Sequence, residues 1–155
     1  MIKYASLALA MLFFAGCKSG GQTTRSVPSD LRIVFGYEGT FAGRSMGYSI
    51  TAAGQVVRWE GKYPEEVVEA TARIDRKHVE RLWRRAEEIE FLRMKEQAMA
   101  TVSSFITVSA QGDSRHVTWA ERDETDLSPP QEFFDECMSV AKAAFNEKST
   151  PRGAR

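Results

Sequence analysis

The order of strand and helix patterns along the chain is the feature that most constrains its fold. Strand patterns cover residues 31–37, 44–60, 67–74, 103–110 and 115–120. Alternation with a period of two, typical of half-buried strands, is found at 31–37 and 46–50, whereas 67–74 is predicted from its β-branched residues. Ala53-Gly54 divides the range 44–60 as a turn, and Gln111-Gly112-Asp113 separates 103–110 from 115–120. The sequence therefore predicts two hairpins, with the pattern at 67–74 as the weakest strand.

Two other stretches have the period of an amphipathic helix. The first begins after Asp75, which suits a helix N-cap, and its apolar side is made of Val79, Leu82, Trp83, Ala86 and Ile89. The second begins at Ser128, which can cap, and continues through Pro129 and Gln131, which suit the first turn of a helix. Because hairpins predominate and the helices are separate from them, we expect an α+β fold. Its mainly antiparallel sheet would have five or six strands, with two amphipathic helices packed on one face.

The first 17 residues have the organisation of a cleaved export signal. Lys3 supplies a positive start, and residues 5–15 are an apolar stretch about half as long as the roughly 20 residues that span a membrane. Small residues, Ala15-Gly16, stand directly before Cys17, as a signal peptidase requires. The arrangement resembles the lipobox of bacterial lipoproteins, with Phe14 where that pattern usually has leucine. The alternative is an ordinary secretory signal with an incidental cysteine.

The resemblance implies a lipid at Cys17. In the lipoprotein pathway a diacylglycerol is transferred to this thiol, and cleavage then makes Cys17 the first residue of the mature chain. Each buried methylene contributes about 0.8 kcal/mol, so a lipid of two or three chains would anchor the protein to the membrane. Lys18 replaces the aspartate that favours retention in the inner membrane of enteric bacteria. We therefore expect the outer membrane, with the protein facing the periplasm.

Composition divides the chain into four parts. These are a cleaved signal peptide at 1–16, a lipidated N-terminus and flexible linker at 17–30, a single α+β domain at 31–145 and a disordered tail at 146–155. Removing the signal removes Lys3 and no acidic residue, so 21 basic and 21 acidic residues become 20 and 21. Nucleic-acid binding needs a clustered basic face, and this nearly neutral balance does not predict it.

Residues that commonly carry catalysis are sparse. The sequence has no HExxH, GxSxG or CxxC motif and no phosphate-binding glycine loop. His78 and His116 have no second metal ligand at helical spacing, and the acidic run at 123–126 lacks the glycine and final glutamate of an EF-hand loop. With Cys17 lipidated, Cys137 would remain alone on an apolar helix face as a buried, inert thiol. We therefore expect a non-enzymatic protein without metal or cofactor.

The three tryptophans have two interpretations. Trp83 belongs to a helical apolar side and is expected in the core. Trp59 and Trp119 lie on predicted strands, where core or cross-strand packing is the favoured interpretation. If both pointed outwards, they would form a platform for a ligand.

The candidate partner-binding loop follows the first strand. It consists of Gly39, Thr40, Phe41, Ala42, Gly43 and Arg44. Its glycines permit a positive φ and a sharp change of direction. Phe41 then either folds back as a lid on the core, which is the favoured interpretation, or projects as an anchor for a partner.

This motif and the element order resemble the emfourin-like group, small α+β proteins that include inhibitors of thermolysin-type metallopeptidases. The resemblance covers about residues 31–145, with Gly39, Phe41, Ala42 and Gly43 matching its motif and Thr40 replacing a glycine. Residues 53–74 and the lipid anchor depart from the group. The resemblance implies a peptidase, or another envelope protein, as the partner of the 38–44 loop. The alternative is a structural or envelope-assembly lipoprotein without inhibitory activity.

Overall fold

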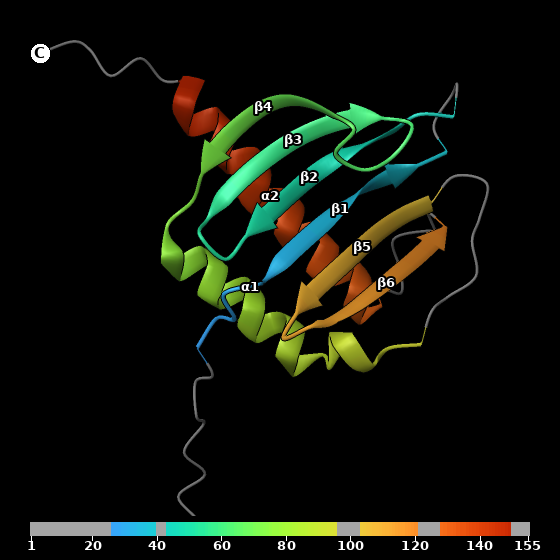
Figure 1. Ribbon diagram of the computed structural model, residues 1–155, viewed down its shortest axis with the longest axis vertical. Coiled ribbons are helices and arrows are strands. Elements are labelled where there is room, and N and C mark those ends of the chain that lie inside the picture. The colour runs from blue at the N-terminus through green and yellow to red at the C-terminus, as the bar shows by residue number, and fades with distance from the viewer. Residues whose placement is uncertain (1–25, 40–42, 96–102, 121–127, 150–155) are drawn as a thin grey trace, which may run out of the picture.

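Six strands of the described chain form one antiparallel sheet, shown with its helices in the computed structural model of Figure 1. The structure describes residues 26–39, 43–95, 103–120 and 128–149. The strands are β1 (Arg32–Glu38), β2 (Ser45–Thr51), β3 (Gln55–Gly61), β4 (Val67–Arg73), β5 (Ser103–Ala110) and β6 (Asp113–Ala120), in the order β4-β3-β2-β1-β5-β6. The predicted α+β fold is confirmed, and the weakest predicted strand is β4.

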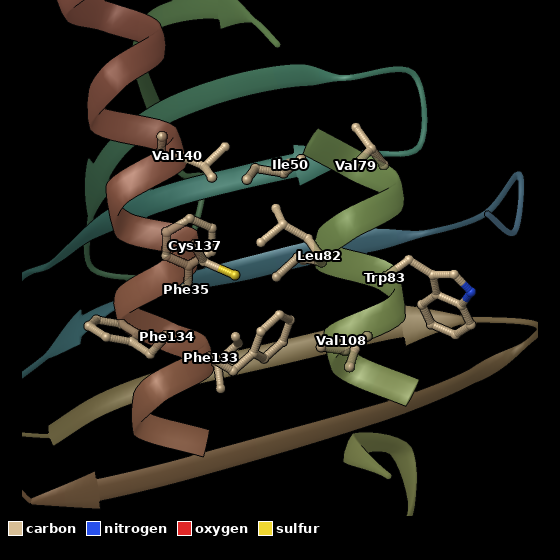
Figure 2. Close-up of a cluster of buried hydrophobic side chains, with 14 of the residues drawn as sticks. Phe35, Ile50, Val79, Leu82, Trp83, Val108, Phe133, Phe134, Cys137 and Val140 are labelled. Atoms are coloured by element: carbon tan, nitrogen blue, oxygen red, sulfur yellow. The ribbon is translucent and has the colours of Figure 1, made fainter. Parts of the chain in front are cut away.

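Both long helices lie on the same face of the sheet, which we call the helix face (Figure 2). They are α1 (Arg76–Glu88) and α2 (Pro129–Ser149), and a short 3-10 turn that the sequence did not predict, η1 (Phe91–Arg93), follows α1. The alternation in β1 places Ile33 and Phe35 towards the helices, where both are fully buried. Leu82 of α1 and Phe133 of α2 lie in the same buried cluster, on the side of the helices. The apolar side of the sheet and the apolar sides of the two helices thus form one hydrophobic core.

The helix ends follow the local sequence with two differences. Asp75 is the N-cap residue of α1, but its side chain makes no capping hydrogen bond with a described residue, and its carboxylate lies 3.5 Å from Lys77 Nζ instead. At α2 the backbone N–H groups of Gln131 and Glu132 donate to the carbonyl of Ser128, and the helix begins at Pro129. It continues to Ser149, four residues beyond the predicted end of the domain, because no helix breaker occurs before Pro151.

The opposite face of the sheet also buries two aromatic rings, those of Trp59 and Phe105. One row across four strands consists of Trp59, Gly47, Gly36 and Phe105 as successive paired residues. Trp59 and Phe105 are both 0% exposed, and their ring centroids are 6.1 Å apart. The connection between β3 and β4 folds over this face, where its Glu65 forms an ion pair with Arg32 (Figure 1).

The favoured interpretation of the strand tryptophans, packing within the fold, is confirmed, and the alternative of an outward platform is wrong. Trp59 is buried on the face away from the helices, whereas Trp119 packs edge-on against Phe134 of α2, with ring centroids 5.4 Å apart, on the helix face. Trp83 is buried, as expected. The two strand tryptophans cannot act together because the pleat directs them to opposite sides of the sheet.

The start of the described chain is tied to the turn between β5 and β6. The backbone N–H groups of Gln111 and Gly112 donate to the two carboxylate oxygens of Asp30, at 3.0 and 2.9 Å. These bonds, the one from Gln111 first, lower the pKa of Asp30 below its ordinary value because they stabilise the charged form. Asp30 thus links the first residues of the domain to a turn 81 positions later.

The effect of Asp30 on stability is expected to depend on pH. A carboxyl whose pKa is lowered on folding stabilises the folded state above its ordinary pKa, and this contribution is lost as the pH falls through the lowered value. Wild type should therefore exceed Asp30→Asn in urea resistance near neutral pH, and the difference should shrink below about pH 4. Urea unfolding across a pH series measures this, and a difference independent of pH would contradict the role of the carboxylate.

Candidate functional site

The predicted partner-binding loop joins the two central strands β1 and β2. Gly39 and Gly43 have φ values of 72° and 65°, the left-handed conformation that glycine adopts readily. Arg44 Nη2 lies 3.1 Å from Glu60 Oε1, so the end of the loop is tied to β3. Thr40, Phe41 and Ala42 lie outside the described residues, so both interpretations of Phe41 stay predictions.

A cavity of about 450 Å³ opens on the helix face beside this loop. We call it the loop-side pocket, and its main lining residues are Tyr37, Met46, Tyr48, Arg58, Glu60, Glu69, Met138 and Lys142. Tyr37 and Met46 are the last residues paired across β1 and β2 before the loop. The volume lies within the range of about 300–1,000 Å³ that is usual for ligand sites.

Apolar side chains held by the core form one side of the pocket. Tyr48 stacks on Phe35 at a centroid distance of 5.9 Å, and Tyr37 packs edge-on against Phe134 at 5.6 Å. Met46 is 45% exposed, although its neighbours in β2 are largely buried. The pocket therefore combines two fixed rings with an adaptable thioether that is open to solvent.

Charged side chains surround this apolar side. Arg58 Nε lies 3.1 Å from Glu69 Oε2, and its guanidinium lies 5.7 Å from the centre of the Phe145 ring. Arg44 pairs with Glu60, whereas for Lys142 of α2 the structure records no ion pair with any described residue. The lining itself holds two basic side chains, Arg58 and Lys142, and two acidic ones, Glu60 and Glu69, so its net charge is zero.

The two histidines lie apart from this pocket. His116 Nδ1 lies 2.7 Å from the hydroxyl of Thr107, and its ring packs beside Phe105 at 5.5 Å. His78 is half-buried on α1, and its Nδ1 has no hydrogen-bond partner in the part of the chain that the structure describes. Among the same residues no group of three or more His, Cys, Asp or Glu side chains is placed to hold a metal ion. The acidic run at 123–126, which was considered as a calcium-binding loop, lies outside the described ranges.

The thiol of Cys137 is in the centre of the helix-face core (Figure 2). Burial raises its pKa well above the ordinary value, and the adjacent carboxylate of Glu136 raises it further. A protonated, inaccessible thiol is a poor nucleophile, so Cys137 serves packing, as the sequence predicted. Cys17, the other cysteine, lies outside the described residues.

The loop-side pocket itself was not predicted. Its strand residues follow from the alternation Met46, Tyr48, Ile50, and Met138 and Lys142 are one helical turn apart on α2. Whether α2 covers these strand residues depends on the angle at which it crosses the sheet (Figure 1). Local periodicity carries no signal for that angle.

Comparison with known proteins does not identify the function of the loop-side pocket. Among the described helices, none is long and apolar enough to span a membrane. No protein-family model matches the chain, and no curated protein matches its sequence.

Proposed function

We propose that this chain is a lipid-anchored protein of the bacterial cell envelope, attached at Cys17 to the outer membrane and facing the periplasm. It acts without catalysis, by binding a segment of another envelope protein. The observation that carries this proposal is the position of the loop-side pocket, directly beside the base of the 38–44 loop.

The chemistry of the pocket fits a protein segment with an apolar side chain. Tyr37, Tyr48 and the two methionines provide an apolar surface, and methionine adapts to partners of different shape. The ion pairs at Arg58 and Arg44 surround it with polar groups that can orient a backbone. A lipid anchor adds affinity by confining the domain and its partner to one membrane surface.

The more specific version is inhibition of a peptidase by the 38–44 loop. It is supported by the glycine-framed motif around Phe41 and by its resemblance to the emfourin-like group. The test is inhibition of a thermolysin-like metallopeptidase by the mature protein. Inhibition that Phe41→Ala reduces supports this version, whereas no inhibition, or equal inhibition by Phe41→Ala, removes it.

A structural or envelope-assembly role is the second candidate, and the edge strand β4 favours it. Val67 and Val68 are 53% and 56% exposed on this strand, one of the two edges of the described sheet. Unpaired edge strands accept further strands from other chains. In this case binding would depend on the edge of β4 and not on the pocket.

A matched pair of isosteric substitutions separates the two candidates. Met46→Gln keeps the shape of the pocket but adds a polar group, so we expect it to weaken capture of a partner about tenfold, roughly the value of one buried apolar side chain. Val68→Thr makes the same kind of change at the edge strand and should leave capture unchanged. Both variants, with the native anchor, are compared by cross-linking in intact envelopes followed by quantitative mass spectrometry. Loss with Val68→Thr and not with Met46→Gln would contradict the pocket and support the structural role.

A further inference from the structure

The charged side chains of the loop-side pocket are not equally satisfied. Both acidic residues of the lining have a basic partner: Glu69 Oε2 lies 3.1 Å from Arg58 Nε, and Glu60 Oε1 lies 3.1 Å from Arg44 Nη2. For Lys142, the other basic residue of the lining, the structure records no ion pair with any described residue. One positive charge at the pocket is therefore available to a ligand, whereas a basic ligand would have to displace Arg58 or Arg44.

Lys142 stands next to the apolar part of the pocket. It follows Met138 by one helical turn on α2, and both residues line the cavity. Side chains of a helix lean towards its N-terminus, which directs the Lys142 side chain towards Met138. Met138 is 7% exposed, whereas Lys142 is open to solvent. A ligand that fills the apolar part therefore brings its neighbouring groups close to an ammonium group.

The apolar part of the pocket suits an aromatic side chain. The rings of Tyr37 and Tyr48 are held in place by Phe134 and Phe35, at centroid distances of 5.6 and 5.9 Å. Aromatic rings attract a further ring that lies edge-on or offset against them. Met46, which is 45% exposed, adds a thioether that packs well beside a ring.

We infer, on the basis of the proposed function, that the partner of the loop-side pocket is a protein segment in which an aromatic side chain stands next to a carboxylate side chain. The aromatic ring packs against Tyr37, Tyr48 and Met46. The carboxylate accepts a hydrogen bond from Lys142 Nζ and so completes a third ion pair at the pocket. Such a pair at an exposed position contributes about threefold in affinity, and its main effect is to select an acidic partner over a basic one.

The test follows the methyl signal of Met46 by NMR in the mature chain, residues 17–155, carrying Cys17→Ser to avoid lipidation. Met46→Leu assigns that signal. The probe is N-acetyl-Asp-Phe-Asp-amide, which offers a carboxylate on each side of the ring, and the controls replace both aspartates with asparagine or the phenylalanine with alanine. We expect a saturable shift with the probe, about threefold weaker binding of the asparagine peptide, and no saturable shift with the alanine peptide. The preference for aspartate should disappear at about 1 M salt, where charges are screened within about 3 Å.

Two lysine variants make the outcome decisive. Lys142→Gln should bind the aspartate and asparagine peptides with equal affinity. Lys77→Gln removes the same charge from α1, outside the pocket, and should keep the threefold preference. Equal affinity of the wild type for the two aromatic peptides, or a preference that Lys142→Gln keeps, overturns the carboxylate contact and leaves the pocket as a binding site. A Met46 signal that moves with neither aromatic peptide contradicts both the carboxylate contact and the pocket of the proposed function.

Discussion

Replacing Gly47 with alanine should destabilise the domain by about 3 kcal/mol or more, the upper end of the cost of overpacking a well-filled interior. A Cβ at this position would lie 2.7 Å from Cζ2 of Trp59 and 2.8 Å from the Cα of Gly36, and it would overlap the carbonyl oxygen of Phe35. A side chain can move aside, but the two backbone atoms belong to β1, which is paired on both sides. Urea unfolding followed by circular dichroism measures the loss.

Gly43→Ala is the matched control. A Cβ there meets no atom of a described residue within 4 Å, and the positive φ of 65° costs about 1 kcal/mol for a non-glycine residue. The two variants therefore separate close packing from backbone conformation. Equal destabilisation by both would show that Trp59 and the neighbouring strand do not require glycine at position 47.

The second large effect is expected at Cys17. Cys17→Ser should abolish incorporation of a labelled fatty acid and release the protein from the membrane fraction, because the proposed function makes this thiol the site of lipid attachment, on the basis of its resemblance to a lipobox. Metabolic labelling and fractionation of intact cells measure both properties.

The other cysteine provides the control for this experiment. Cys137→Ala removes a buried thiol whose pKa is raised, so labelling and membrane retention should both persist. Membrane retention that is unchanged in Cys17→Ser would contradict the lipoprotein hypothesis and favour an ordinary secretory signal. Loss of labelling in Cys137→Ala alone would place the modification at a residue that the fold makes inaccessible, and would contradict the structure.

The sequence by itself determined the local elements of this protein. Alternation in 31–37 placed Ile33 and Phe35 on the buried side of β1, and Ser128, Pro129 and Gln131 marked the start of α2. These signals are strong because each depends on residues within one or two turns of the same element. The proposed export signal that ends at Cys17 is a local pattern of the same kind.

The tertiary structure alone decided which elements meet. Placing β5 beside β1 brings Phe105 next to Gly36, and from there to Trp59 across Gly47, which gives the sheet a second buried face. The angle of α2 leaves the loop-side pocket open. Each of these depends on contacts between residues far apart in the chain. A periodicity records only whether a side chain points in or out, and it does not record which strand or helix lies next to it.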